Sequence, residues 1–160
     1  MGRNDYVLKK VLYACALMIA IFSLGYFFNY KIGNLGYVSL ADVFIMLFSN
    51  YFIPSYAMLI AAIPCTLCDL VLGYNQYALY TFIIKAFEGY SIGYLLNKNK
   101  KFLITSVIIG LITALLSILT DIYLYGNDIM SISLKKNLIQ QSILLIIVNI
   151  IYYSMKKIRK

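Results

Sequence analysis

Residues 102–125 read FLITSVIIGLITALLSILTDIYLY, an apolar run in which Asp121 is the one charged residue. A helix rises about 1.5 Å per residue and the hydrocarbon core of a bilayer is about 30 Å thick, so about 20 apolar residues can cross it. The run is too long for a strand and lacks the alternation of apolar and polar residues that strands show. We therefore predict a transmembrane helix over Phe102–Tyr125.

Five further apolar runs flank this segment, separated by short polar or glycine-containing stretches. We predict six transmembrane helices, over residues 7–28, 38–52, 55–72, 77–96, 102–125 and 132–155. The second run is short for a full span, and Pro54 predicts a tight turn after it because proline disfavours helix at the preceding residue. The first run exceeds the roughly 7–15 residues of a signal-peptide core, so we expect it to be retained. The sequence predicts an all-α integral membrane protein with one six-helix domain over residues 1–160.

The composition supports a membrane protein. The chain has 160 residues, of which 62% are hydrophobic and 12% charged, whereas soluble domains carry roughly 45–50% apolar and about 25% charged residues. A small water-soluble globule could not bury so many apolar side chains, because its surface is large for its volume. The net charge of +8 comes from short basic clusters beside the apolar runs, which is typical of membrane anchors. We expect the lipid bilayer, and no nucleic acid, among the partners.

Lysines and arginines are divided unequally between the two sides of the predicted bundle. If the N-terminus is cytoplasmic, the cytoplasmic side carries ten of them: Arg3, Lys9, Lys10, Lys98, Lys100, Lys101, Lys156, Lys157, Arg159 and Lys160. The outer side carries three, namely Lys31, Lys135 and Lys136. Because positive residues are enriched in cytoplasmic segments, we predict that both termini are cytoplasmic.

Polar side chains inside the predicted helices gather in the outer half of the bundle. Ionisable groups in the hydrocarbon core are costly unless they have partners or water. A channel would need a polar path through both halves of the membrane, whereas a pocket open to the outside needs only one. We therefore predict an outward-facing pocket for a small, polar, ring-bearing solute. Its candidate substrate-binding residues are Asp42, Tyr77, Tyr80, Thr81, Lys85, Glu88, Asp121, Asn137 and Gln141.

Two features of this polar set have an alternative, structural interpretation. Lys85 and Glu88 lie three residues apart, so their side chains fit one face of a helix as an ion pair. Such a pair serves either a ligand or only the fold, and the residues alone leave both open. We interpret Asp69, in the last turn of its predicted helix, mainly as a structural anchor.

Small residues four positions apart let helix backbones approach closely. Gly89 and Gly93 form a GxxxG, which we expect to pack within the bundle. Ala16 and Ala20 form an AxxxA on the first helix. We predict that the face with Ala16 and Ala20 binds a partner protein.

The sequence gives no support for catalysis. It contains no histidine, so a His-based triad is excluded, and it has no GxxxxGK[ST] phosphate loop. Cys65 and Cys68 form a CxxC without the further ligands that a zinc site needs, and we interpret them as small packing residues. We expect no catalytic residue, metal site or cofactor, and therefore no enzyme.

Three stretches of the chain resemble a known family. They are GYVSLAD at residues 36–42, DLVLGY at residues 69–74 and YTFIIKAFEG at residues 80–89. Their order is similar to that in the substrate-binding S components of energy-coupling factor (ECF) vitamin transporters, which are ABC importers. The nearest subgroup contains the riboflavin-type, pyridoxine and hydroxymethylpyrimidine carriers, and the resemblance runs from the first predicted helix to the last.

This resemblance implies a bacterial cell-membrane protein with six helices and a substrate pocket near the outer face. It also implies that small residues on the first helix, here Ala16 and Ala20, dock on a transmembrane coupling protein. Two ATPase subunits would complete the complex and drive uptake. Pyridoxine-like or hydroxymethylpyrimidine ligands are favoured by size, and riboflavin follows them because it needs a larger pocket.

Two other functions stay open on the residues alone. A stand-alone secondary transporter of a small polar solute would depend on an ion gradient, although the sequence has no obvious inverted repeat. A non-transporting membrane scaffold would use its buried polar groups for structure and would bind no small molecule.

Overall fold

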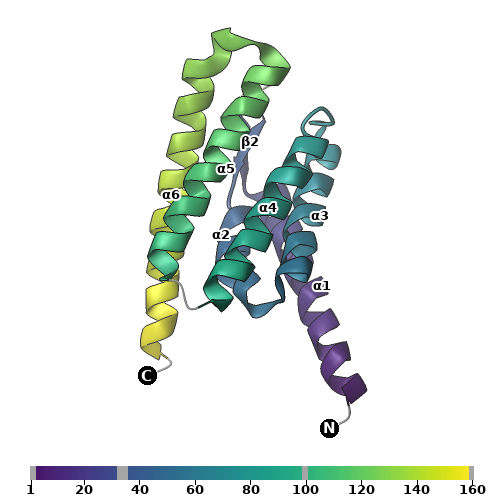
Figure 1. The fold of residues 1–160 in the computed structure, drawn as a ribbon. Coiled ribbons are helices and arrows are strands. Elements are labelled where there is room, and N and C mark those ends of the chain that lie inside the picture. The colour runs from purple at the N-terminus through teal and green to yellow at the C-terminus, as the bar shows by residue number, and fades with distance from the viewer. Residues whose placement is uncertain (1–2, 32–35, 99–100, 159–160) are drawn as a thin grey trace.

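The computed structural model describes residues 3–31, 36–98 and 101–158 (Figure 1). The helices are α1 (Arg3–Phe27), α2 (Ala41–Phe48), α3 (Pro54–Leu72), α4 (Ala78–Asn97), α5 (Phe102–Tyr125) and α6 (Met130–Ile158). Two short strands, β1 (Asn29–Lys31) and β2 (Tyr37–Ser39), and two 3₁₀ helices, η1 (Ser49–Tyr51) and η2 (Asn127–Ile129), complete the described elements. The prediction of a mainly helical protein is confirmed.

Helices α3, α4 and α5 begin and end within one residue of their predicted bounds. Pro54 is the first residue of α3, where its missing N–H leaves no hydrogen bond unmade. Gly73 follows the last residue of α3 with a φ of 87°, a left-handed conformation that favours glycine. At the chain ends, α1 starts four residues before its predicted bound and α6 extends beyond its predicted range on both sides.

The segment before α2 departs from the all-α prediction. Strands β1 and β2 pair antiparallel, with Asn29 opposite Ser39 and Lys31 opposite Tyr37. Because β2 occupies residues 37–39, the predicted helix over residues 38–52 is reduced to α2 and the short η1. The eight residues of α2 rise about 12 Å, far less than a bilayer core of about 30 Å.

Among the described residues, four helices are long and apolar enough to cross a membrane: α1, α3, α5 and α6. Leu119 of α5 and Ile146 and Ile150 of α6 are each more than 60% exposed, as lipid-facing side chains are. α4 does not meet the same criterion, and it carries the charged residues Lys85 and Glu88. The prediction of six spans therefore stays a prediction.

The helices form two antiparallel pairs, α3 with α4 and α5 with α6, and α1 packs against α3. Both chain termini lie at one end of the molecule, and the turns that join the helices of each pair lie at the other (Figure 1). The expected GxxxG contact is present within the bundle. Gly89 and Gly93 of α4 face Ala57 of α3 so closely that a Cβ on Gly89 would collide with the Ala57 backbone.

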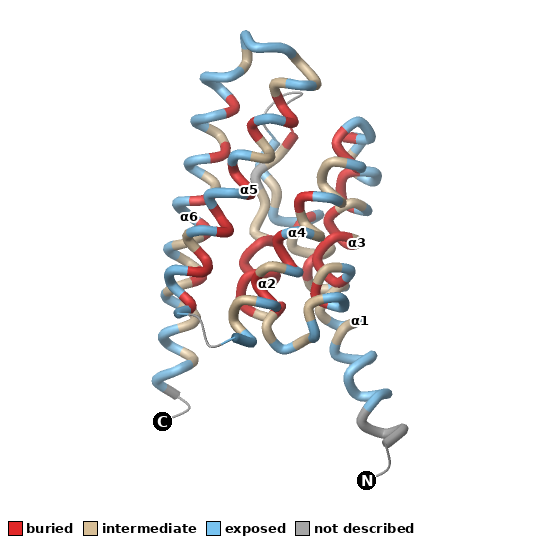
Figure 2. Tube along the Cα trace, viewed as in Figure 1, coloured by how far each residue is buried: buried red, intermediate tan, exposed pale blue. Residues whose placement is uncertain are grey.

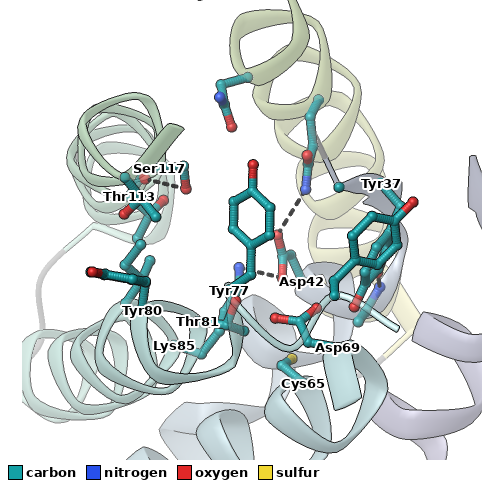
Figure 3. A pocket seen from close by; sticks show the side chains of 18 of the residues that line it. Tyr37, Asp42, Cys65, Asp69, Tyr77, Tyr80, Thr81, Lys85, Thr113 and Ser117 are labelled. Atoms are coloured by element: carbon teal, nitrogen blue, oxygen red, sulfur yellow. Dashed lines mark hydrogen bonds and ion pairs between the residues drawn. The ribbon is translucent and has the colours of Figure 1, made fainter. Parts of the chain in front are cut away.

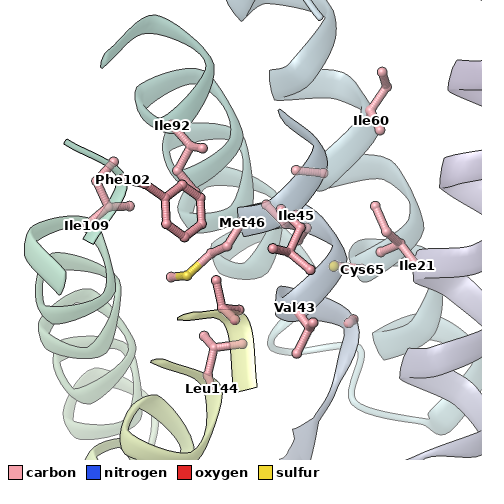
Figure 4. Packing of buried hydrophobic residues seen from close by; sticks show 14 residues of the cluster. Ile21, Val43, Ile45, Met46, Ile60, Cys65, Ile92, Phe102, Ile109 and Leu144 are labelled. Atoms are coloured by element: carbon pink, nitrogen blue, oxygen red, sulfur yellow. The ribbon is translucent and has the colours of Figure 1, made fainter. Parts of the chain in front are cut away.

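Buried residues concentrate at α2 and the helix segments beside it (Figure 2), and apolar side chains pack together there (Figure 4). Ile45 and Met46 are almost completely buried, and their cluster includes Ile92 of α4, Ile109 of α5 and Leu144 of α6. One turn earlier in α2, the chain becomes polar and lines a pocket. The core therefore closes the pocket on the side of the chain termini.

Candidate functional site

A polar pocket lies between β2 and the ends of α2 to α6 that face away from the termini (Figure 3). The cavity volume is about 110 Å³. That volume is room for several waters, since one water needs about 10–15 Å³ on such a measure. The polar lining residues come from the N-terminal halves of α2, α4 and α6, from the C-terminal half of α3, and from the middle and C-terminal part of α5.

Lys85 is the centre of an ion-pair group at the floor of the pocket. Its Nζ lies 2.5 Å from Asp42 Oδ1 and 2.8 Å from Glu88 Oε2. The Glu88 contact is the predicted pair on one helix face, and the Asp42 contact joins α4 to the first turn of α2. Gln140 of α6 donates its amide to the second oxygen of Asp42 at 3.3 Å. Removal of Lys85 would leave two buried carboxylates without their cation, which is strongly unfavourable.

Asp121 of α5 organises a second polar group, nearer the turns. The Tyr77 hydroxyl donates to Oδ1 at 2.8 Å, and the Ser133 hydroxyl donates to Oδ2 at 2.5 Å. Asn137 donates to the same Oδ2 at 3.3 Å, and Lys136 forms an ion pair with it at 2.8 Å. Asp121 is 1% exposed, so these four groups replace the water that a charged carboxylate would otherwise bind. They tie α4, α5 and α6 together across the pocket.

Asp69, at the end of α3, lines the pocket together with Tyr37 and Thr81. The residue is 4% exposed, and its Oδ2 has no hydrogen-bond partner among the described residues. Tyr37 belongs to β2, outside the helices, and burial together with the Asp69 charge raises the pKa of its phenol. Tyr37 therefore stays protonated at neutral pH, and its hydroxyl keeps a hydrogen that it can donate.

Three tyrosines form a chain of ring contacts along the pocket wall. Tyr37 and Tyr74 have their ring centroids 5.6 Å apart, and Tyr74 and Tyr77 have theirs 6.4 Å apart. Aromatic walls of this kind suit a flat ring while the hydroxyls provide hydrogen bonds.

Eight of the nine predicted substrate-binding residues line this pocket: Asp42, Tyr77, Tyr80, Thr81, Lys85, Asp121, Asn137 and Gln141. The ninth, Glu88, is completely buried beneath Lys85 and lines no part of the cavity. A role for these residues in substrate binding stays a prediction.

Several lining residues were missed, among them Tyr37, Asp69, Lys136 and Gln140. A signal for the α6 residues was present in the sequence. Five polar residues of α6 follow the i, i+3, i+4, i+7, i+8 spacing of one helix face: Ser133, Lys136, Asn137, Gln140 and Gln141. Lys136 was counted only as an orientation anchor, because its pairing with Asp121 depends on how the α5–α6 turn sets the two helices.

A second hollow, of about 700 Å³, lies at the terminus end of the molecule. We call it the α1 groove. Ala16 and Ala20 of α1 line it, together with the aromatic residues Tyr13, Phe44, Phe48, Tyr51 and Phe52. Lys9 and Lys10 lie at the groove as well. The predicted partner face is thus an apolar concave surface with two positive charges.

We compared the chain with curated proteins, with solved structures and with protein-family models. No curated protein matches the chain. Among solved structures, the crystal structure of FolT bound with folic acid superposes with a TM-score of 0.70 at 20% sequence identity, covering 93% of this chain and 93% of that chain. At that identity the likeness shows the fold alone. The family model of the ECF-type riboflavin transporter S component matches residues 8–157. Since that match covers nearly the whole sequence, the chain belongs to the family of ECF-type riboflavin transporter S components.

Proposed function

We propose that this chain captures a heteroaromatic vitamin at the outer face of a bacterial cell membrane and presents it for ATP-driven import. The observation that carries the proposal is the polar pocket, which is walled by tyrosines and closed toward the termini by an apolar core. A few polar groups in a concave site fix the orientation of a ligand, and aromatic walls supply its contact area. Family membership supports the role of a transporter subunit and gives no reason to expect catalysis.

Riboflavin-type ligands take first place among the substrates we propose. The sequence alone favoured pyridoxine-like or hydroxymethylpyrimidine ligands on grounds of size. Two comparisons support a larger ring system instead, because the family is named for riboflavin and FolT binds folic acid in a similar fold. The tyrosine chain from Tyr37 to Tyr77 offers a long aromatic wall for such a ring.

The orientation we propose has both termini in the cytoplasm and the pocket open to the outside. Both termini lie at the end of the molecule away from the pocket (Figure 1). The terminus end also carries the basic residues of the α6 tail, Lys156 and Lys157. These positions agree with the positive-inside rule. All six helices would then belong to one membrane domain, with α2 dipping only part of the way into the bilayer.

The partner we propose for the α1 groove is a transmembrane coupling protein, itself driven by two ATPase subunits. Ala16 is exposed and Ala20 is half-buried, so small side chains leave the groove open to another protein. A stand-alone secondary transporter would not need such a surface, and a scaffold would not need the pocket.

Mass spectrometry of small molecules retained by the purified protein tests the proposal. We expect a flavin or a related heteroaromatic vitamin in about equimolar amount, and calorimetry should then give its affinity after the ligand has been removed and added back. A protein that retains no ligand and binds no vitamin in calorimetry would favour the scaffold. Uptake that needs an ion gradient but no ATPase would favour the secondary transporter.

A further inference from the structure

The described part of the pocket carries more negative than positive side chains. Three carboxylates line it, those of Asp42, Asp69 and Asp121, and the carboxylate of Glu88 contacts Lys85 directly beneath it. Lys85 and Lys136 are the lysines among the lining residues. Carboxylates therefore outnumber lysines four to two at the pocket.

Both lysines are already paired with carboxylates. Lys85 contacts Asp42 at 2.5 Å and Glu88 at 2.8 Å, and Lys136 contacts Asp121 at 2.8 Å. An anionic group entering the pocket would have to displace one of these carboxylates from its lysine or remain without a cation. Either outcome leaves an uncompensated negative charge in a buried site, which is unfavourable.

Five buried side-chain oxygens in the described part of the chain lack hydrogen-bond partners, and three of them point to the same ligand chemistry. These three are Asp69 Oδ2, Glu88 Oε1 and Gln141 Oε1, which lie at or directly beneath the pocket, whereas Asn50 Oδ1 and Asn149 Oδ1 belong to residues outside its lining. Carboxylate and amide oxygens accept hydrogen bonds and cannot donate them. Buried polar groups without partners are rare in native proteins. A ligand that carries N–H or O–H donors would satisfy Asp69 and Gln141, the two that line the cavity.

We infer that this pocket selects uncharged or cationic ligands rich in hydrogen-bond donors and rejects their phosphorylated or carboxylate-bearing counterparts, with Asp69 as the main discriminating residue. The inference rests on the proposed function, because it names the class of vitamin for the same site. The other two lining carboxylates are already paired, Asp42 with Lys85 and Asp121 with Lys136. Asp69 is therefore the lining carboxylate that has an oxygen free to accept a hydrogen bond from a ligand. The folate ligand of the structural neighbour, which carries carboxylates, falls in the rejected class.

Matched ligand pairs test the inference by isothermal titration calorimetry on the purified chain in detergent. The pairs are riboflavin with riboflavin 5′-phosphate, and pyridoxine with pyridoxine 5′-phosphate; folic acid is added as a carboxylate-bearing ligand. Within each pair that binds, we expect the phosphate ester to bind at least about tenfold more weakly, since like charges placed together are strongly unfavourable at a binding site. Folic acid should bind no better than the phosphate esters.

Asp69→Asn supplies the residue-level test. It keeps the size of the side chain but removes one negative charge and one acceptor. We expect it to weaken binding of the uncharged parent vitamin about tenfold, as loss of a hydrogen bond to a charged group does. We also expect the difference in affinity between the parent vitamin and its phosphate ester to become smaller. Asp128→Asn is the matched control, because Asp128 is exposed in η2 and lines no part of the pocket. The Asp128→Asn variant should change neither the affinity for the parent vitamin nor the difference in affinity between parent and phosphate ester.

The outcomes separate the two levels of the proposal. A phosphate ester or folic acid that binds as tightly as an uncharged parent would overturn the charge selection while leaving the vitamin-binding function in place. An Asp69→Asn variant that binds both members of a pair as the natural chain does would remove Asp69 from the discriminating role. If no vitamin of the panel binds, the proposed function fails and the inference fails with it.

Discussion

Lys85 Nζ and Asp42 Oδ1 lie 2.5 Å apart although 43 residues separate them in the chain. The contact joins the fourth element of the fold, α2, to the middle of α4, and so holds the short helix at the floor of the pocket. Helix α2 carries Asp42 as well as the core residues Ile45 and Met46. The ion pair therefore holds in place a helix that belongs both to the apolar core and to the polar pocket.

Lys85→Met is expected to lower the stability of the protein. Among the described residues, Lys85 is the cation that contacts both Asp42 and Glu88, and the variant leaves two buried carboxylates without it. Breaking a buried pair by removing one partner typically costs about 3–5 kcal/mol. Thermal unfolding in detergent, followed by circular dichroism, measures the loss.

The triple variant with Lys85→Met, Asp42→Asn and Glu88→Gln separates charge from packing. It removes all three charges together, so we expect it to recover most of the lost stability. Calorimetry on the folded variants with the vitamin identified by mass spectrometry then reports on the ligand. Unchanged affinity in a folded Lys85→Met protein would show that Lys85 serves the fold and not the substrate.

The Lys85 group also shows which contacts a sequence can predict. The pair with Glu88 follows from a spacing of three residues on one helix, and no tertiary information is needed. The pair with Asp42 depends on β1 and β2, which turn the chain back before α2. Strands of three residues are too short to show a period-two pattern. The sequence showed that the second apolar run was short, but it showed neither the strands nor the start of α2 at Ala41.

Gly89→Ala is expected to destabilise the α3–α4 pair. A Cβ at Gly89 would lie 2.8 Å from Ala61 Cβ and would also collide with the Ala57 backbone, which cannot rotate away. Forcing extra atoms into a close-packed interface typically costs about 1–3 kcal/mol. Gly93→Ala is the matched comparison, because its Cβ would meet Ala57 Cβ at 3.3 Å. The melting temperature of Gly89→Ala should be lower than that of Gly93→Ala. Equal melting temperatures would contradict the packing described.

Ala16→Phe is expected to weaken assembly with the coupling protein and to leave vitamin binding intact. The substitution fills part of the α1 groove, which lies at the opposite end of the molecule from the pocket. Cys15→Phe is the matched control, since Cys15 is exposed on the neighbouring position of α1 and lines no part of the groove. Co-purification with the coupling protein and calorimetry with the vitamin provide the two measurements. Equal loss of both activities in Ala16→Phe would indicate folding damage instead of a docking surface.

The proposed orientation predicts which loops react from outside intact cells. In a background with Cys15→Ser, Asn127→Cys places a thiol in η2, next to the pocket end, and Lys98→Cys places one after α4, at the terminus end. Both positions are exposed. A membrane-impermeant thiol reagent should label residue 127 in intact cells and residue 98 only after lysis. The reverse pattern would show that the pocket opens to the cytoplasm.

Lys135 and Lys136 are adjacent in the sequence, but the structure gives them different surroundings. Lys136 forms a 2.8 Å ion pair with Asp121, and the two side chains are 8% and 1% exposed. Lys135 is exposed. By the sequence alone both were outer-face anchors, because the difference arises only when the α5–α6 turn brings residue 136 to Asp121.

Lys136→Met is therefore expected to destabilise the protein by about 3–5 kcal/mol, because it leaves the buried Asp121 carboxylate without its cation. Tyr77→Phe removes one neutral donor from the same carboxylate, which keeps its contacts to Lys136, Ser133 and Asn137. Loss of that hydrogen bond should cost less, about 1–3 kcal/mol. Lys135→Met is the matched control and should lie within about 0.5 kcal/mol of the natural chain, as surface substitutions usually do. Thermal unfolding of the three variants tests the order. If Lys135→Met and Lys136→Met unfold at the same temperature, Lys136 is only a surface anchor and the Asp121 group does not hold α5 and α6 together.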